Sequence, residues 1–279
     1  MKKRYLIIHA DDAGLALSHN RAIQEGILRG SISSCSLMVP TPWFFEMAKF
    51  CLDFPALDYG IHLTLTGEWK HYPFRPLSPL HKIPSLITDK EYFHSSRKPF
   101  ETIVKAEEVY IELKSQIDHA LNLGLKPSHL DSHMYTLGLR QDLMEVYIQL
   151  GKDYKLPILC SSTLVEYTGG NSEKISFNQP EWKNIYIAHF EHFKNESLTA
   201  FYDKVIDNLP VGLSQILIHP AYPCASMKCI THDHPNFGAA WRAEDAIYFL
   251  SKSTQQKIKD LEIELVGWKE VMALNLLHA

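Results

Sequence analysis

Acidic and imidazole side chains recur at four places in the chain where a short apolar run ends. An aspartate combined with two histidines offers one carboxylate oxygen and two imidazole nitrogens. Such a set suits a catalytic divalent metal ion and leaves a coordination position for water. The residues at these four places are Asp11 and Asp12, His62, Asp131 with His133, and His219.

Each of these residues also has an ordinary structural explanation when it is taken alone. Adjacent aspartates ahead of Gly14 are typical of a turn and the start of a helix. A single histidine at a strand end, such as His62, often serves packing, and the segment 131–133 could cap a loop. The metal-site hypothesis therefore depends on the joint occurrence of these residues at strand ends.

The elements that must position these residues alternate between strand-like and helical patterns. This alternation predicts parallel β/α units, and seven or eight of them favour a TIM-like (β/α) barrel over an open sheet. In such a barrel the carboxyl ends of the strands meet on one rim, so the four clusters should converge there. Strands are predicted at 5–8, 34–39, 57–65, 128–130, 158–160, 185–188, 216–218 and 262–266. Helices are predicted at 18–28, 43–51, 107–123, 141–153, 197–208, 243–258 and 268–277.

Composition places the chain among ordinary globular proteins. It has 279 residues, of which 46% are hydrophobic and 22% charged. We expect a single domain over 1–279, with a long loop excursion rich in proline and aromatic residues at about 67–100. No repeat or linker divides the chain.

The charge pattern excludes several classes of partner. The formal net charge is −4 and no polybasic run is present, which argues against nucleic-acid binding. No apolar stretch reaches the roughly 18–20 residues of a membrane span, and the apolar run after the N-terminal lysines is too short for a signal peptide. The five cysteines fit free thiols in a reducing compartment. We therefore expect a cytoplasmic protein without a membrane partner.

Four short motifs follow one another along the chain. They are residues 9–15, Gly-Ile-His-Leu-Thr-Leu-Thr at 60–66, His-Leu-Asp-Ser-His at 129–133 and Ile-His-Pro at 218–220. In their order and spacing they resemble the YdjC-like carbohydrate deacetylase family, which includes chitooligosaccharide deacetylases. The resemblance covers about residues 5–250, and Asn20, Gly30, the Ser33–Ser34 pair and residues 112–117 also fit it.

The resemblance implies a TIM-like barrel, one divalent metal ion and hydrolysis of N-acetyl groups on amino sugars or short oligosaccharides. It implies that Asp12, His62 and His133 are the metal ligands. Asp11 would then be the catalytic base and His219 the acid, while the reverse order of the two aspartates is the alternative. Asp131 is expected to orient a ligand imidazole. Imidazole ligation suits Zn²⁺, whereas an open site that keeps water could hold Mg²⁺.

Aromatic residues near the strand ends are candidates for the sugar site. Trp69, Tyr135 and Trp241 could stack on sugar faces, with packing in the core as the alternative. Arg242 could steady Asp11 or a substrate hydroxyl, or form a surface salt bridge. The chain departs from the family pattern at Ala13, Met134–Tyr135 and Ala221, and Ala13 and Tyr135 could reshape the sugar pocket.

A second group, Cys224, Cys229, His232 and His234, fits a compact zinc site poorly because of its spacing. We expect it to form a polar loop over the barrel mouth.

Two other functions are compatible with the same residues. A phosphoesterase-like metallohydrolase would use a similar Asp/His site, but the sequence shows no Arg, Lys or glycine-rich motif for phosphate near the four clusters. A non-catalytic sugar-binding protein would be expected to lose one of the metal or base positions, and all are present. The sequence is compatible with a homodimer but determines no oligomeric state.

Overall fold

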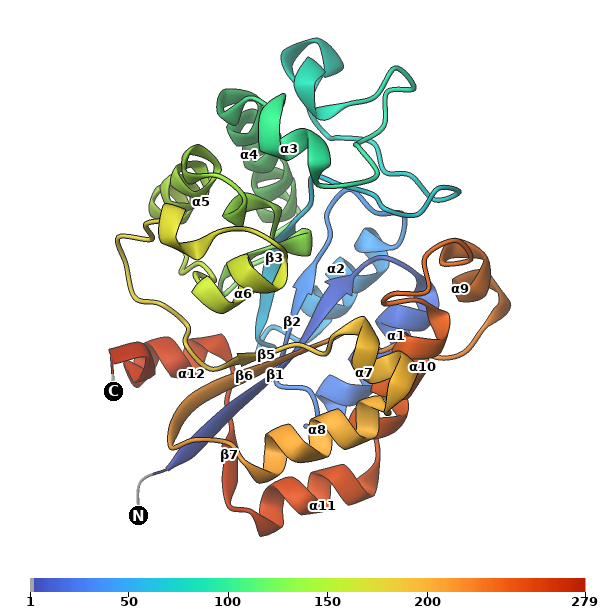
Figure 1. Ribbon diagram of the computed structural model, residues 1–279, viewed down its shortest axis with the longest axis vertical. Helices are drawn as coiled ribbons and strands as arrows, with labels where there is room; N and C mark the ends of the chain where they lie inside the picture. Colours follow the sequence, from blue (N-terminus) through green and yellow to red (C-terminus); the bar gives the residue numbers. More distant parts are fainter. Residues whose placement is uncertain (1–2, 279) are drawn as a thin grey trace.

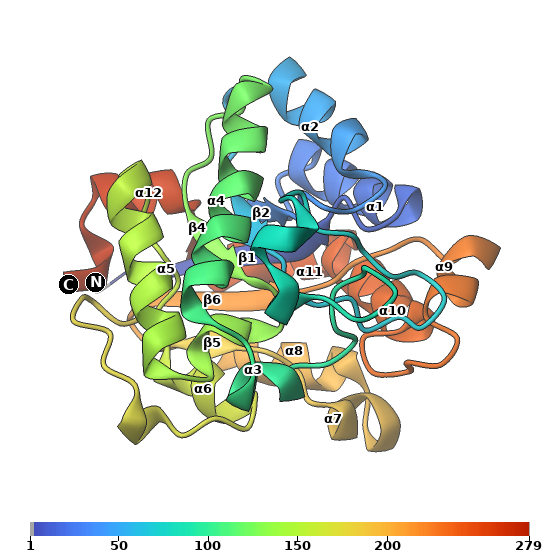
Figure 2. The same ribbon diagram turned by 90° about the horizontal axis from the view of Figure 1, so that it is seen from above.

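The computed structural model describes residues 3–278 as a parallel sheet with helices around it (Figures 1 and 2). Met1, Lys2 and Ala279, which the predicted domain includes, lie outside the described residues. The strands are β1 (Arg4–Ala13), β2 (Ser34–Leu37), β3 (Tyr59–Leu63), β4 (Leu130–Ser132), β5 (Ile185–Tyr186), β6 (Gly212–Ile218) and β7 (Ile263–Leu265).

Twelve α-helices alternate with these strands in the described part of the chain. They are α1 (Leu17–Leu28), α2 (Phe44–Asp53), α3 (Lys98–Thr102), α4 (Ala106–Asn122), α5 (Gln141–Tyr154), α6 (Ser162–Tyr167), α7 (Phe190–Asn195), α8 (Leu198–Asp207), α9 (Ala225–Ile230), α10 (Ala239–Phe249), α11 (Lys252–Asp260) and α12 (Trp268–Ala273).

The sheet runs in the order β4-β3-β2-β1-β6-β5, and β7 pairs with the beginning of β1. Its strands pair in parallel, which requires a crossover between neighbours and so places helices on the outside. Strand β1 lies at the centre and is buried along most of its length, including Leu6, Ile7 and Ile8. The α/β class and the parallel sheet are therefore confirmed.

The predicted closure into a TIM-like barrel is only partly present. Regular pairing ends at β4 on one side and β5 on the other. The predicted strand at 158–160 makes only an isolated bridge, between Leu130 and Ile158. On its other side, the Trp182 N–H donates to the Cys160 carbonyl over 2.8 Å. Isolated hydrogen bonds, rather than a regular strand, thus span the gap.

The prediction of one continuous helix over 243–258 is wrong, because the chain forms two helices there, α10 and α11. Ser251 separates them, and its Oγ accepts a hydrogen bond from the Thr254 N–H. This is an N-cap, which serine favours over a helix interior. The short helices α3, α6, α7 and α9 were not predicted, since each is too short to show a clear helical period.

The segment 67–100 contributes to the core, contrary to its description as an excursion. Six of its apolar side chains are buried: Trp69, Phe74, Ile83, Leu86, Phe93 and Phe100. Its ribbon lies beside α4 at the end of the molecule toward which β1 and β3 point (Figure 1).

Helix α4 anchors this segment through a buried carboxylate. Glu112 is fully buried and accepts hydrogen bonds from the N–H groups of Leu77, at 3.1 Å, and Ser78, at 2.9 Å. The Gln116 amide donates a third, at 2.9 Å. These backbone N–H groups of the loop are therefore hydrogen-bonded to a helix side chain instead of to water.

Within residues 3–278, every helix is too short or too polar to cross a bilayer.

Glu112→Ala should destabilise the protein, because it leaves two loop N–H groups without their acceptor. We expect the free energy of unfolding, measured in urea, to fall by about 1–3 kcal/mol. Glu107→Ala, at an exposed position of the same helix, is the matched control and should change it little. Equal effects of the two substitutions would contradict the anchoring role.

Candidate active site

A β-bulge at the end of β1 gives the two adjacent aspartates different directions. Ala10 pairs with Cys35 and Ala13 with Leu37, so β1 carries one residue more than β2 over this stretch. Asp12 also has a φ of 62°, in the left-handed region that L-residues seldom adopt. Bulges of this kind re-aim side chains next to active sites.

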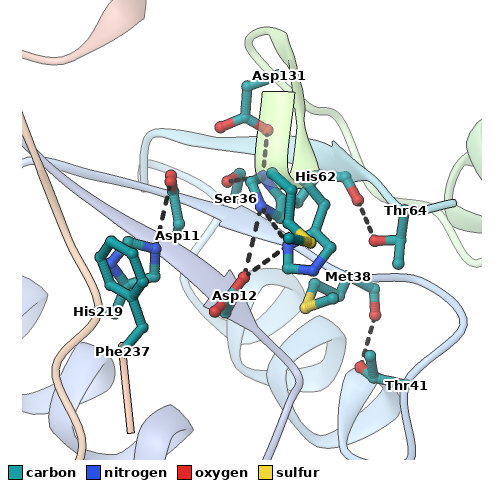
Figure 3. Close-up of polar contacts among 12 residues, drawn as sticks. Asp11, Asp12, Ser36, Met38, Thr41, His62, Thr64, Asp131, His219 and Phe237 are labelled. Atoms are coloured by element: carbon teal, nitrogen blue, oxygen red, sulfur yellow. Dashed lines mark hydrogen bonds and ion pairs between the residues drawn. The ribbon is translucent and has the colours of Figure 1, made fainter. Parts of the chain in front are cut away.

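Asp12, His62 and His133 converge on one point. Asp12 Oδ1 lies 3.1 Å from His133 Nδ1 and 3.4 Å from His62 Nε2. The two imidazole nitrogens are 3.3 Å apart. Figure 3 shows Asp12 and His62 facing one another beneath Asp131. The structure thus brings together the three residues predicted as ligands.

The donor set fits a single metal ion. With bonds of about 2.0–2.2 Å, two donors lie about 3 Å apart at a right angle and about 3.4 Å apart at a tetrahedral angle. The separations between the three donors match this range. Asp12 Oδ1 is buried and makes no hydrogen bond of good geometry with any residue that the structure describes. A cation would supply the partner that this oxygen lacks.

Two other groups of possible donors are present among the described residues. They are Asp11 with His62 and Asp131, and His9 with His129 and Asp131. Their atoms already pair with one another: His62 Nδ1 lies 2.8 Å from Asp131 Oδ1, and His9 Nε2 lies 3.0 Å from Asp131 Oδ2. Asp12, His62 and His133 all line the cavity described below, whereas His9 and His129 do not, and Asp131, which both other groups need, is already paired on both oxygens. We therefore take them as the candidate metal site.

Each ligand histidine has a carboxylate at its other nitrogen. Asp131, predicted to orient a ligand imidazole, contacts His62 Nδ1. Glu68 Oε2 lies 3.0 Å from His133 Nε2. Such contacts fix the tautomer and ring orientation of metal-binding histidines. They leave His62 Nε2 and His133 Nδ1 facing Asp12.

The charges in the site depend strongly on one another. Burial raises the pKa of Asp12, but Arg242, His133 and His62 outweigh burial and hold it well below its usual range. Burial lowers the pKa of His133, but Glu68 and Asp12 raise it to about 9. For His62, Asp131 and Asp11 likewise outweigh burial and hold the pKa well above its usual range. In the metal-free protein the surrounding carboxylates therefore favour the protonated form of both imidazoles.

Asp11 has its shortest contacts with two histidines outside the candidate ligand set. Its Oδ1 lies 3.2 Å from His9 Nε2, and its Oδ2 lies 3.7 Å from His219 Nε2 (Figure 3). Asp11 lines the cavity beside Asp12 and so stands next to the candidate ion. This position is suitable for the predicted base.

His219 is held by its backbone and is neutral at rest. Its N–H donates to Asp245 Oδ2 over 2.8 Å, and Asp245 also accepts from the Tyr202 hydroxyl. Burial lowers the pKa of His219 to about 3. The role of His219 as the acid stays a prediction, and this lowered pKa means that His219 would first have to take up a proton.

Arg242 bonds Asp12, and not Asp11 as one of the predictions had it; its predicted contact with a substrate hydroxyl stays a prediction. Its Nη2 donates to Asp12 Oδ2 over 2.6 Å, and its Nε donates to the Phe237 carbonyl. Arg242 is fully buried, so the alternative of a surface salt bridge is also wrong. Arg242 lies on α10, so the packing of this helix places a residue from late in the sequence beside the end of β1.

A cavity of about 440 Å³ opens over these residues. Trp69 and Trp241 are absent from its wall, although both were predicted to contact sugar. They are 2% and 1% exposed, Trp69 packing near the Arg242 guanidinium and Trp241 against Phe237. Both tryptophans therefore belong to the core, which is the alternative that the sequence left open.

Tyr135 does line the cavity, but its hydroxyl is already used. It donates to the Leu159 carbonyl at 3.1 Å and accepts from the Ser161 N–H at 2.8 Å. Only the ring is available to a ligand. Other aromatic side chains in the wall are Tyr167, Phe190 and Phe237.

Two arginines reach the cavity: Arg242, which was predicted near the site from the sequence, and Arg97, which was not predicted. Arg97 and Arg242 both line it. Arg97 already donates to the carbonyls of Met134 and Thr168, and Arg242 to Asp12. The sequence showed no arginine or lysine motif near the four clusters. The fold nevertheless brings these two arginines into the cavity wall.

The cysteine and histidine group at 224–234 forms no metal-ligand cluster among the described residues. His234 instead lines the cavity together with Asn236. Cys224 caps α9 and Cys229 lies within it, so the group is only partly the loop that was expected.

Comparison with known proteins now identifies the family. The family model described as YdjC-like protein matches residues 5–260. The chain belongs to the YdjC-like family. A carbohydrate deacetylase of Enterococcus faecalis is 35% identical over 74% of this chain and 72% of that protein. A carbohydrate deacetylase of Thermus thermophilus is 30% identical over 96% and 94%.

A solved structure shares the YdjC-like fold seen here. It is a protein of Enterococcus faecalis with a suggested role in cellobiose-phosphate cleavage. Its TM-score is 0.74 at 24% identity, covering 96% of this chain and 99% of that one. The resemblance inferred from the four motifs is confirmed by the family match.

Metal binding should strengthen as the pH rises. Protonated imidazoles cannot coordinate, and the pKa of His133 is raised to about 9 in the metal-free protein. From about pH 6 to about pH 8.5, the affinity for Zn²⁺ should increase, with release of about one to two protons per ion bound. Titration calorimetry in buffers of different ionisation enthalpy measures both quantities. An affinity that does not change with pH would contradict the assigned ligands.

Proposed function

We propose that this protein is a metal-dependent deacetylase that hydrolyses N-acetyl groups on amino sugars or short oligosaccharides. The observation that carries the proposal is the placement of Asp11 in the same cavity as the converging donors of Asp12, His62 and His133. A base beside a metal site is what metal-assisted amide hydrolysis requires. The names of the carbohydrate deacetylase relatives support the substrate class.

Asp12, His62 and His133 would hold the ion. When bound, it would supply a Lewis acid that polarises the acetyl carbonyl and makes water more acidic. Two imidazole nitrogens favour a transition ion such as Zn²⁺, with Mg²⁺ as the alternative. Arg242 keeps Asp12 ionised and aims its free oxygen at the imidazoles.

Asp11 would accept the proton of the attacking water. Its carboxylate is held from one side by His9, whose pKa rises to about 9 because Asp11 and Asp131 outweigh burial. His9 thus places a positive charge beside the Asp11 carboxylate, 3.2 Å from its Oδ1. An ionised carboxylate next to the metal site is ready to act as a general base.

His219 would pass a proton to the departing amine only after receiving one during the reaction. At rest it is neutral, and its Nε2 lies within 3.7 Å of Asp11. The proton taken by Asp11 can therefore reach the amine directly or through His219. Either route returns both groups to their starting state.

The sugar would bind in the 440 Å³ cavity, whose size lies in the range of about 300–1,000 Å³ typical of small-molecule sites. Phe237 and Tyr167 are better placed than the two tryptophans to contact a sugar face. Phe237 already packs against His219, with ring centroids 4.6 Å apart. Stacking there would place the sugar close to the proposed acid.

The scaffold supports this activity as one irregular TIM-like barrel, with 157–160 standing in for a regular strand. We assign the whole chain to a single domain, since the segment 67–100 packs into the core and supplies part of the cavity wall. A cytoplasmic location and a homodimer stay predictions from sequence.

Substitution of each aspartate in turn should distinguish the role of Asp11 from that of Asp12. Asp11→Asn keeps shape but cannot accept a proton, so acetate release should slow by about 10²–10⁴ while metal content stays near normal. Asp12→Asn should lower metal content, because a neutral amide is a weaker ligand. Metal analysis and turnover measured on the same samples test this. The opposite pattern would reverse the assignment.

A substrate panel tests the proposed reaction class. N-acetylated mono- and oligosaccharides should release acetate only when the protein carries a divalent ion, and His133→Ala should abolish both binding and release. Phosphate esters offered at the same concentration should not be hydrolysed. Phosphate release without acetate release would favour a phosphoesterase, and sugar binding without either product would favour a non-catalytic protein.

A further inference from the structure

Glu68 belongs to none of the four sequence motifs, but its carboxylate lies beside the candidate metal site. Its Oε2 lies 3.0 Å from His133 Nε2, and its side chain is 9% exposed. The opposite nitrogen of the same ring, Nδ1, faces Asp12 Oδ1 and His62 Nε2. Glu68 therefore contacts the outer side of one candidate ligand.

The backbone around Glu68 is held on both sides. The Gly67 N–H donates to the His94 carbonyl over 3.1 Å, and Thr66 forms a parallel bridge with His94. Trp69 is buried with its ring centroid 5.7 Å from the Arg242 guanidinium carbon. A side chain between two such anchors has few alternative positions.

We propose that Glu68 is a positioning residue that selects Nδ1 of His133 as the metal-binding atom. By accepting the Nε2–H proton, it fixes the tautomer whose Nδ1 lone pair faces Asp12. Asp131 has the corresponding role for His62, but on the opposite ring nitrogen. It contacts Nδ1 and leaves Nε2 facing Asp12. This inference deepens the proposed function and rests on its metal site.

Two other roles for Glu68 fit the geometry less well. A fourth ligand would have to approach the three donors, yet Glu68 belongs to none of the clusters of possible ligand atoms found in the described residues. Contact with substrate is compatible with its place in the cavity wall, but its near carboxylate oxygen is already engaged by His133.

Zinc affinity of the metal-free protein provides the test, measured by competition with a chromophoric chelator. Glu68→Ala should weaken Zn²⁺ binding by about 10–100-fold, the range for lost partners of metal-binding histidines. Glu68→Gln should recover part of the affinity, because its amide oxygen can still accept the Nε2–H. Asp89→Ala, at an exposed position of the same segment, is the control and should bind like wild type.

A second readout needs no change at Glu68. In protein labelled with ¹⁵N-histidine, zinc should perturb Nδ1 of His133 and leave its Nε2 protonated, with the signal assigned from a His133→Asn variant.

Unchanged Zn²⁺ affinity in Glu68→Ala, an effect on KM alone, or zinc on Nε2 of His133 would overturn the proposal. Wild-type protein that binds no zinc would overturn the metal site as well. Zinc binding without acetate release would overturn only the proposed reaction.

Discussion

The carboxylate of Asp12 is buried among two imidazoles and a guanidinium, and most features of the site serve to hold these charged groups together. Burying a carboxylate is costly unless other groups compensate its charge. Arg242 compensates one oxygen, at 2.6 Å, and leaves the other for the space between His62 and His133. Because these partners come from β3, α10 and the end of β4, the sheet must bring distant parts of the chain together before the site can exist.

The same constraint explains the irregular end of β1. A regular strand would send Asp11 and Asp12 to opposite faces of the sheet. The bulge between Ala10 and Ala13, with the left-handed backbone of Asp12, lets both carboxylates reach one cavity while they face different histidines. Backbone strain of this kind persists where the surroundings over-determine the conformation. Here the bond from Arg242 and the packing of the neighbouring strands provide that support.

The sequence predicted the residues that follow strands and missed those that arrive from irregular segments. Asp12, His62 and His133 could be found because the carboxyl ends of parallel strands share one rim. Glu68 could not, since its segment has no periodicity that would show how it folds back over the strands. Trp69 and Trp241 were given exposed roles because aromatic residues beside strand ends suit sugar stacking, yet both turn into the core. The closure of the barrel was overestimated for a related reason: 158–160 has the composition of a strand but makes only isolated hydrogen bonds.

The most direct test of the proposed metal centre is anomalous diffraction from crystals of the protein loaded with zinc, recorded on both sides of the zinc absorption edge. The geometry predicts one strong peak at about 2.0–2.2 Å from Asp12 Oδ1, His62 Nε2 and His133 Nδ1. A peak at the group of His9, His129 and Asp131, or zinc bound only at surface residues, would contradict the assignment of the site.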